Sequence, residues 1–482
     1  MRKATIIIFA LVIGTCSRSP GTLEEVLSSG ELRVVTRNSP TTYFRGAGGL
    51  EGPEYLLVKG FAEFLSDKYD RPVIATFETI ERFSEILPAL ENNQFHLAAA
   101  GLTVTDERSK RVVFGPDYQN VTQHLVYKLN TGKPRSLEDL QGKQLEIMSG
   151  SSYTETLERY RTDNPELSWS ENPNADISEL LLAVANQEID YTIADTTDFE
   201  VHRDYLPELR SAMELKNGDK LAWAFRKYRS DEILDEAQEY FAQIRANGEL
   251  EQILDRYYGH REEFDYVGTR TFIRHHDNRL HTYRGLFVDA GERTDTDWRL
   301  LAAIGYQESH WNPQAVSPTG VRGLMMLTRS TASTMGVTDR EDPEQSILAG
   351  AEYFAKLRKR LSDIPEPDRT WFALAAYNIG YSHVRDAQRI VRMQNGNPDR
   401  WLDVKDALPK LAQQKWHSQV PFGYARGWVP VQYVSNVRTY YEILNWLTAE
   451  ENPEESRKPQ RIMTPRSPRL QTAAVRYIYS RT

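Results

Sequence analysis

A glutamate at the end of an apolar helical stripe is the side chain in this sequence best suited to acid–base chemistry. In the segment 298–311, Leu301, Ile304 and Glu308 fall on one helical face. Burial disfavours the charged form of a carboxyl group and raises its pKa. Such a group suits general-acid catalysis near neutral pH. Two structural alternatives stay open, an exposed acid at the helix end or an ion pair with Arg322.

The residues around Glu308 form an ordered series of motifs. Gln-Glu-Ser-His-Trp-Asn-Pro at 307–313 is followed by Gly-Leu-Met-Met at 323–326 and by Ala-Ala-Tyr-Asn-Ile-Gly at 375–380. From about Trp298 to about Leu447, this set resembles the goose-type-lysozyme-like lytic transglycosylases of bacterial cell walls. The resemblance implies an all-α, lysozyme-like domain with Glu308 as its catalytic acid.

The same resemblance implies a substrate-binding role for five further residues. Met326 stands where many members have Gln, and a thioether cannot make the hydrogen bonds of an amide. The hydroxyl of Tyr433 is expected to approach Glu308, and Ser309 to bind the substrate or Glu308. The five residues are Ser309, Met326, Tyr377, Asn378 and Tyr433.

A single acid is unusual, because ordinary glycosidases use two carboxyl groups. The nearby acids at 339, 341, 342 and 344 fall in what reads as a solvated loop. The resemblance implies that Glu308 first protonates the glycosidic oxygen of peptidoglycan, while the N-acetyl oxygen of N-acetylmuramic acid attacks the anomeric carbon. Glu308 then takes the proton of the sugar's 6-hydroxyl, and a 1,6-anhydro ring closes. Hydrolysis on the same fold, and a sensor whose second domain only grips glycan, remain as alternatives.

Helix-period apolar residues run through the second half of the chain. They predict helices over 269–289, 330–335, 343–360, 369–377, 382–394 and 433–447, separated by Gly, Pro or Asn. Aromatic faces suit sugar rings, so a glycan groove across these helices is expected to be lined by aromatic side chains. The candidates are Trp311, Tyr377, Tyr424, Trp428 and Tyr433.

The first half alternates strand and helix patterns. Strands are predicted at 32–36, 73–77 and 97–101, with helices over 56–69 and 80–92 between them. This order predicts an α/β domain that binds ligands at the carboxyl ends of its strands.

Further motifs in this half are Gly-Glu-Leu-Arg-Val at 30–34, Gly-Leu-Thr-Val-Thr-Asp-Glu-Arg at 101–108 and Ile-Asp-Tyr-Thr-Ile-Ala-Asp at 189–195. They resemble the two-lobed periplasmic solute-binding proteins of the polar amino-acid type. The resemblance implies that Arg108 clamps a ligand carboxylate, a task that suits a guanidinium fork. It also implies that Asp195 pairs the ligand amino group. The remaining expected ligand residues are Tyr43, Thr103 and Ser152. Without the resemblance, Arg108 would read as one solvated charge among several.

The chain is therefore expected to hold a two-lobed α/β domain over 21–267, with its second lobe at about 129–217, and an all-α lytic transglycosylase domain over 268–449. A polar, disordered tail is expected over 450–482. Residues 1–20 combine Arg2, Lys3 and a short apolar run, which predicts a secretory signal. Cys16 ends that run, so either lipidation there or cleavage nearby by the ordinary signal peptidase is open.

The composition of the chain limits the classes of partner that it is expected to bind. A net charge of −9 argues against a nucleic-acid binder. No cofactor or metal is expected, because His275, His276 and His281 lack an acidic or cysteine partner at ligand spacing. The expected partners are peptidoglycan strands, a small amino-acid or peptide ligand, and the outer membrane through peripheral or lipid-anchored attachment. The expected location is the periplasm of a Gram-negative cell.

Overall fold

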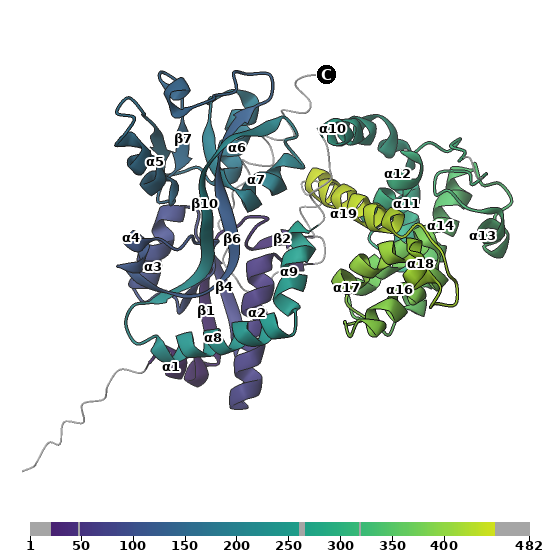
Figure 1. Ribbon diagram of the computed structural model, residues 1–482, viewed down its shortest axis with the longest axis horizontal. Helices are drawn as coiled ribbons and strands as arrows, with labels where there is room; N and C mark the ends of the chain where they lie inside the picture. Colours follow the sequence, from purple (N-terminus) through teal and green to yellow (C-terminus); the bar gives the residue numbers. More distant parts are fainter. Residues whose placement is uncertain (1–20, 47–48, 260–265, 318–319, 449–482) are drawn as a thin grey trace, which may run out of the picture.

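A computed structural model describes residues 21–46, 49–259, 266–317 and 320–448. It comprises an α/β part and a helical part (Figure 1). The α/β part is built on a six-stranded sheet in the order β4-β1-β5-β10-β6-β9. Its strands are β1 (Glu31–Thr36), β4 (Ile74–Thr79), β5 (Leu97–Ala98), β6 (Val112–Lys128), β9 (Thr192–Asp195) and β10 (Leu209–Arg226).

The α/β part has two lobes, and two long strands of the sheet, β6 and β10, connect them. β1 is parallel to β4 and β5, whereas β10 is antiparallel to β5 and β6. β6 and β10 pair from Leu209 with Lys128 to Arg226 with Val112, with several register shifts between these ends. They cross from one lobe into the other (Figure 1). Two connections between lobes of this kind suit a domain that opens and closes around a ligand.

Each lobe has its own apolar core. The first packs Leu32, Phe61, Trp223 and their neighbours, and the second packs Leu125, Ile147, Leu181 and theirs. The first lobe carries helices α1 (Thr22–Ser29), α2 (Pro53–Tyr69), α3 (Ile86–Glu91), α4 (Asp106–Ser109), α8 (Asp231–Ala246) and α9 (Glu249–Tyr258), with the hairpin β2 (Phe44–Gly46) and β3 (Gly49–Glu51). The second carries α5 (Tyr153–Arg161), α6 (Ile177–Asn186) and α7 (Thr196–Arg203), with strands β7 (Glu146–Met148) and β8 (Ser170–Asn172).

The helical part surrounds one core that includes Leu301, Phe354, Phe372 and Ile443. Its main helices are α10 (Tyr266–His275), α11 (His281–Thr294), α12 (Trp298–Ser309), α13 (Arg329–Thr334), α14 (Pro343–Arg360), α15 (Asp368–Ile379), α16 (Tyr381–Met393), α17 (Trp401–Ala407), α18 (Gln414–His417) and α19 (Trp428–Thr448). A π-helical turn, His276–Leu280, joins α10 to α11. The predicted fold class, an α/β two-lobed domain followed by an all-α domain, is confirmed.

Some boundaries differ from the sequence prediction for identifiable reasons. α19 begins at Trp428 rather than at Tyr433, because Pro430 lies in its first turn, where a missing N–H breaks no helical bond. β5 ends at Ala98, three residues before the predicted end. α17 has too few residues for a clear helical period, and the sequence did not reveal it.

α19 is the element through which the helical part contacts both lobes. The Arg438 guanidinium binds Asp255 of α9, in the first lobe, at 3.4 Å. Nearer the end of α19, the Trp446 ring stacks on Tyr205, just after α7 of the second lobe, with ring centroids 5.2 Å apart. One helix of the second domain therefore touches each lobe of the first.

Candidate active site and ligand cleft

Glu308 lies in the last turn of α12. Asp297 caps the start of this helix, because its carboxylate accepts a 2.9 Å hydrogen bond from the Arg299 amide. Leu301 and Ile304, on the face that leads to Glu308, are fully buried. At Gly305 the side chains of Leu324 and Met325 approach the helix so closely that a Cβ would lie 2.9 Å from the Leu324 methyl group. The absence of a side chain at Gly305 thus brings the loop 323–327 against the catalytic end of α12.

Among the described residues, the carboxyl group of Glu308 has one hydrogen-bond partner, Tyr433 of α19. The Tyr433 hydroxyl donates to Oε1 of Glu308 at 2.7 Å, and Tyr433 is itself buried. Burial raises the pKa of Glu308 to about 7, against the opposing effect of this hydrogen bond. Arg322 pairs with Glu341 at 2.5 Å, so the alternative of an Arg322–Glu308 ion pair is wrong. Glu308 is a carboxyl group that can both donate and accept a proton near neutral pH.

Tyr377 and Ser309 fix the loop that faces Glu308. The Tyr377 hydroxyl donates to the Met325 carbonyl at 2.9 Å, and its pKa is raised by burial and by the charge of Glu308. The Ser309 hydroxyl donates to the Leu324 carbonyl at 2.8 Å and to Gly305. Met326 adopts a left-handed backbone conformation, with φ of 47°. These contacts hold α12 and the loop in one arrangement.

The neighbouring acids have structural partners of their own. Asp342 caps α14 by accepting from the Gln345 amide, and Asp339 accepts from the Glu341 amide. Within the described residues, the pKa of Glu308 is shifted by burial and by Tyr433, without a contribution from another carboxylate. The arrangement therefore supplies one acid rather than a pair.

The aromatic candidates separate into core and surface residues. Trp311 is 1% exposed and donates to the Ala302 carbonyl, so it packs in the core and cannot line a groove. Tyr424 and Trp428 are more than half exposed. Asn378 is also exposed, at the end of α15. Sequence spacing could not separate these cases, because Trp311 has polar sequence neighbours but is buried, whereas Trp428 has apolar ones but is exposed.

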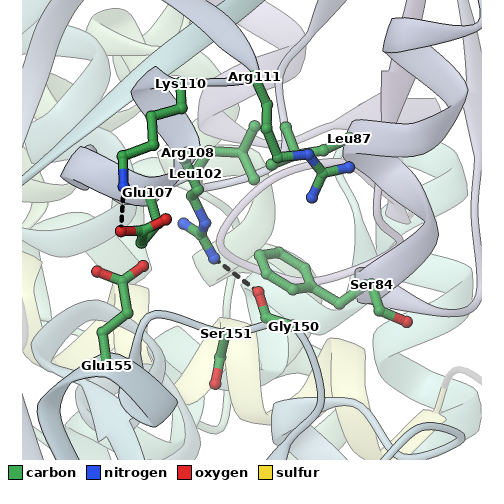
Figure 2. A pocket seen from close by; sticks show the side chains of 11 residues that line it. Ser84, Leu87, Leu102, Glu107, Arg108, Lys110, Arg111, Gly150, Ser151 and Glu155 are labelled. Atoms are coloured by element: carbon green, nitrogen blue, oxygen red, sulfur yellow. Dashed lines mark hydrogen bonds and ion pairs between the residues drawn. The ribbon is translucent and has the colours of Figure 1, made fainter. Parts of the chain in front are cut away.

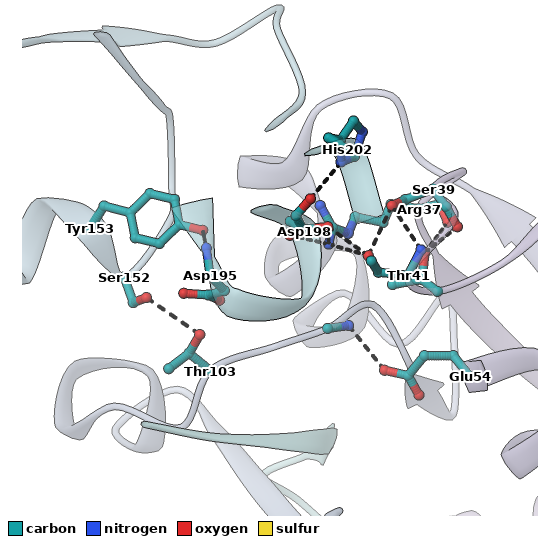
Figure 3. A network of polar contacts seen from close by, with 12 residues as sticks. Arg37, Ser39, Thr41, Glu54, Thr103, Ser152, Tyr153, Asp195, Asp198 and His202 are labelled. Carbon is teal, nitrogen blue, oxygen red and sulfur yellow. Dashed lines mark hydrogen bonds and ion pairs between the residues drawn. The ribbon is translucent and has the colours of Figure 1, made fainter. Parts of the chain in front are cut away.

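In the α/β part, four of the predicted ligand residues converge on the cleft between the lobes. Arg108 and Thr103 come from the first lobe, and Ser152 and Asp195 from the second, and all four are buried. The Ser152 hydroxyl donates to the Thr103 hydroxyl at 3.4 Å across the cleft (Figure 3). The structure thus brings together residues that lie far apart in the sequence.

Arg108 bridges the lobes through backbone carbonyls. Its guanidinium donates to Thr103 O at 2.8 Å and to Gly150 O at 2.9 Å, and it lies 5.5 Å from the Phe83 ring. The side chain also lines a cavity of about 430 Å³, together with Glu107, Lys110 and Glu155 (Figure 2). The cavity beside this guanidinium offers space for a polar ligand.

Asp195 is a buried acid with an unsatisfied oxygen. Within the described residues no donor bonds its Oδ1. Burial raises the pKa of Asp195 to about 7, and the nearby charges of Asp198 and Asp219 add to this effect. Burying an unpaired carboxylate is costly, so a cationic group that enters the cleft would be stabilised there.

Sequence reasoning missed a buried ion pair between the lobes. Arg37, just after β1, donates to both carboxylate oxygens of Asp198 in α7, at 3.0 and 3.2 Å (Figure 3). Thr41 donates to the same carboxylate at 2.7 Å. Burial, the largest single cause, would raise the pKa of Asp198, but the Arg37 and His202 charges and the hydrogen bonds from Thr41 and Arg37 together outweigh it and the pKa is lowered. The signal available in the sequence was a charged residue at the carboxyl end of a predicted parallel strand.

Tyr43 and Glu54 belong to the first lobe and pack against its core. The Tyr43 ring stacks on Phe77 at 5.1 Å, so one of its faces is covered by the protein. Glu54 is buried and accepts from Trp223 and Tyr118. It also accepts from the Gly101 amide (Figure 3). Glu54 therefore fixes the loop that begins at Gly101 and leads to Thr103.

The histidines noted in the sequence do not form one cluster. His275 bonds the Tyr306 hydroxyl, while His276 pairs with Asp277. Among the residues that the structure describes, no cluster of three or more His, Cys, Asp or Glu side chains could hold a metal ion.

Two family models match the chain. Residues 32–260 match "Bacterial extracellular solute-binding proteins, family 3", and residues 285–399 match "Transglycosylase SLT domain". The matched regions correspond to the α/β part and to the greater share of the helical part.

Curated relatives match across most of the chain. Membrane-bound lytic murein transglycosylase F 1 of Alkalilimnicola ehrlichii is 46% identical over 428 residues, which are 88% of this chain and 85% of the relative. Membrane-bound lytic murein transglycosylase F of Saccharophagus degradans is 44% identical over 443 residues, 91% of this chain and 87% of the relative.

Solved structures with similarity include an ancestral arginine-binding protein bound to arginine. It is 25% identical and has a TM-score of 0.43, covering 48% of this chain and 98% of that one. A mutant of ArgBP from T. maritima is 19% identical with a TM-score of 0.44, covering 49% and 99%.

Proposed function

The chain belongs to the membrane-bound lytic murein transglycosylase F family, and from this premise we propose that Glu308 alone serves as its acid and then its base. The enzyme is a lytic murein transglycosylase. The proposed reaction cleaves the β-1,4 bond between N-acetylmuramic acid and N-acetylglucosamine and leaves 1,6-anhydromuramoyl ends. One observation carries the proposal: Glu308 is an acid with a pKa of about 7 whose carboxyl group accepts a 2.7 Å hydrogen bond from Tyr433.

In the first step, protonated Glu308 gives its proton to the glycosidic oxygen. The bond between that oxygen and the anomeric carbon breaks, and N-acetylglucosamine leaves with the proton. The N-acetyl oxygen of the muramic residue attacks the anomeric carbon and takes the place of a second carboxylate. Glu308 is left as a carboxylate, stabilised by the hydrogen bond from Tyr433.

In the second step, the Glu308 carboxylate takes the proton of the muramic 6-hydroxyl. The 6-oxygen attacks the anomeric carbon, the N-acetyl group is released, and the 1,6-anhydro ring closes without water. Glu308 returns to its protonated form, so one group completes the cycle. A pKa near 7 suits both halves, because neither protonation state is strongly disfavoured at neutral pH.

Four residues on the loop and groove are proposed to hold the substrate, two by contact and two by positioning the loop. Asn378, exposed at the end of α15, offers an amide to the sugar, while Met326 offers an apolar contact rather than hydrogen bonds. Tyr377 and Ser309 act through the loop, because both donate to its carbonyls.

The α/β domain is proposed to bind an amino acid or a muropeptide. Arg108, which lines the cavity, would receive the carboxylate together with Thr103. Asp195, whose Oδ1 lacks a donor among the described residues, would receive the amino group. Ser152 and Tyr43 would complete the site. The match to family 3 solute-binding proteins supports this assignment.

Ligand binding is proposed to regulate the catalytic domain. A ligand can do so when its affinity differs between two states of the whole protein. α19 supports such coupling, because it contacts both lobes and also carries Tyr433. Movement of one lobe relative to the other would therefore act on the helix that holds the catalytic acid.

The enzyme is proposed to act in the periplasm at the outer membrane. Both relatives described above are named as membrane-bound enzymes. No helix among the described residues has the length and apolar character to cross a bilayer. The proposed secretory signal and Cys16 lie outside the described residues, as does the tail at 450–482.

Mass spectrometry of the products from purified peptidoglycan tests the chemistry. Wild type should release anhydro-muropeptides, and Glu308→Gln should release none. Products heavier by one water would instead identify a hydrolytic lysozyme. Unchanged turnover by Glu308→Gln would show that a different group supplies the proton.

A further inference from the structure

Two buried acceptor atoms lie at neighbouring positions of the large sheet in the α/β domain. One is Oδ1 of Asp195, and the other is Oε1 of Gln123, a residue with 0% exposure. Within the part of the chain that the structure describes, no group donates a hydrogen bond to either atom. Burying an acceptor without a donor is costly, and such groups are few in native proteins. Two of them in one place are therefore candidates for contact with a ligand.

The pairing of β6 with β9 brings the two side chains together. Gln123 of β6 lies directly opposite Asp195 of β9 in this antiparallel pair. Directly opposite residues point to the same face of a sheet, and their Cβ atoms lie about 4.5–5.5 Å apart. Two acceptors that share one ammonium group, each at about 2.8 Å and at the tetrahedral angle, lie about 4.6 Å apart. The spacing of the two positions thus suits a single ammonium group.

The orientation of the Gln123 amide follows from its other contacts. Its Nε2 donates to Oδ2 of Asp219 at 2.8 Å and to Oγ of Ser152 at 3.3 Å. Turning the amide over would place Oε1 against the Asp219 carboxylate, so that an acceptor would face an acceptor. The two donors of this amide are therefore committed to the protein, whereas its acceptor is not.

Hydrogen bonds connect Gln123 to two of the predicted ligand residues. Ser152 accepts from Gln123 and donates to Thr103 of the first lobe at 3.4 Å (Figure 3). That interlobe bond is longer than an ordinary O–H···O hydrogen bond and is correspondingly weak. A ligand that separates Ser152 from Thr103 on entering the cleft loses little by doing so. Gln123 therefore belongs to the same site as these residues.

The charges around the two acceptors favour a cation. Asp219 pairs with Lys216 at 2.6 Å, and Asp198 pairs with Arg37 at 3.0 Å. Asp195 has no ion-pair partner among the described residues, so the charge that remains uncompensated here is negative. An ammonium group carries the opposite charge and three N–H donors.

We propose that Gln123 is a further ligand-binding residue of the α/β domain, which acts with Asp195 to select ligands that carry an unacylated ammonium group. Oδ1 of Asp195 accepts one N–H of this group, and Oε1 of Gln123 accepts a second. Free amino acids and peptides with a free amino end carry such a group. An acylated nitrogen is neutral and has a single N–H, so the amino end of a peptide that is joined to muramic acid does not fit. The inference rests on the proposed ligand-binding function and narrows the ligand to one chemical class.

The test is a double-mutant cycle by calorimetry on the full chain, with Gln123→Met as the variant. The probes are the tightest binder among the common L-amino acids other than proline and the L-alanyl dipeptides, its N-methyl derivative and its N-acetyl derivative. N-methylation keeps the charge and removes one N–H, so the affinity of the wild type should fall about tenfold. Gln123→Met should bind the unmodified probe about tenfold more weakly than the wild type, and N-methylation should then cost little more. The N-acetyl probe should bind the wild type at least about a hundredfold more weakly than the unmodified probe.

Gln144→Met, the same substitution at an exposed position of the second lobe, is the matched control and should leave all three affinities unchanged. A purely structural role of Gln123, through its bonds to Asp219 and Ser152, would weaken the unmodified and N-methyl probes by the same factor and overturn the assignment. Equal affinity of the wild type for the unmodified and N-acetyl probes would overturn the selection of an ammonium group. The proposed ligand-binding function fails separately, if none of these amino acids and dipeptides binds the wild type.

Discussion

The hydroxyl of Tyr433 donates a 2.7 Å hydrogen bond to Oε1 of Glu308, although the two residues lie 125 positions apart in the sequence. The contact joins the last long helix of the catalytic domain to the helix that carries the acid. It opposes the effect of burial on the pKa of Glu308. The balance between burial and this one hydrogen bond therefore determines the pH at which the acid works.

Replacing Tyr433 by Phe should move the alkaline limb of kcat/KM upward. The hydroxyl stabilises the carboxylate, so its removal raises the pKa of Glu308 further above about 7. A hydrogen bond to a charged group contributes about 1.5–3 kcal/mol, which corresponds to a rise of about 1–2 pH units. Since the first step needs the protonated acid, activity should persist to higher pH, although kcat falls. A pH–rate profile measures both effects.

Tyr441→Phe is the matched control for this prediction. Its hydroxyl lies on the same helix and also bonds a carboxylate, Asp297, but at the far end of α12 from Glu308. The alkaline limb of this control should stay where it is in the wild type. A limb that stays fixed in Tyr433→Phe, or moves to lower pH, would contradict the assigned hydrogen bond.

Glu308→Gln should stabilise the protein against unfolding at pH 8 but not at pH 4. The folded pKa of about 7 lies above the unfolded value of 4.5, so the folded state binds more protons between these limits. Wild-type stability should thus fall as pH rises through this window, by up to about 3 kcal/mol from this group. Gln does not titrate, so the difference between the two urea unfolding free energies isolates Glu308. A difference that does not vary with pH would show that Glu308 has an ordinary pKa.

The sequence was sufficient to predict most of the catalytic domain because its helices combine regular apolar spacing with clear caps and breaks. Glu308 stood out as an acid at the end of an apolar face, and α12 is buried along that face as predicted. The sequence could not distinguish core from groove among the aromatic residues. Trp311 is packed in the core while Trp428 is exposed, and this difference depends on tertiary contacts that have no local pattern.

The ligand cleft was predictable only in part, for a related reason. Motifs indicated the residues at the ends of strands, and Arg108, Thr103, Ser152 and Asp195 do lie at one cleft. The Arg37–Asp198 pair was missed, because its members come from different lobes and lie 161 positions apart in the sequence. Long-range pairs of this kind depend on the relative position of two cores.

Ligand affinity in the α/β domain should increase as pH rises from 6 to 8. The pKa of Asp195 is about 7, and a ligand amino group would bind its carboxylate form. Calorimetry with the common L-amino acids and purified muropeptides as probes should find a ligand whose affinity rises about tenfold over this range. Asp195→Asn should remove most of the pH dependence. Affinity that is independent of pH in the wild type would count against pairing by Asp195.

Arg108→Ala should lower the affinity for the same ligand by about thirtyfold or more, because it removes one partner of a buried charged contact. Arg111→Ala is the control. Arg111 also lines the cavity but is more exposed and pairs with Glu91 at 2.6 Å. Its loss should have little effect on affinity, since exposed ion pairs contribute at most about 1 kcal/mol. Equal effects of the two substitutions would indicate a general charge effect rather than a carboxylate clamp.

Asp255→Ala should weaken the contact between the two domains and change how the acid is held. Asp255 of α9 accepts from Lys405 and from Arg438, each at 3.4 Å, and Arg438 also donates to the backbone carbonyls of Asp255 and Arg256 at 2.8 and 2.9 Å. The Arg438 side chain is 3% exposed, so Asp255→Ala removes a carboxylate from beside a buried guanidinium. Such a loss typically costs about 3 kcal/mol or more.

Two measurements together check this last prediction. Hydrogen exchange should show faster exchange in α9 and α19 of Asp255→Ala, while α14, which lies away from the contact, should exchange as in the wild type. The pH–rate profile should also change, because α19 carries Tyr433 five residues before Arg438, and a looser helix holds the hydroxyl less firmly against Glu308. Glu63→Ala, which removes an exposed partner of Lys59, should alter neither. If Asp255→Ala loosens α19 without changing the pH–rate profile, the domain contact stabilises the structure but does not position the acid.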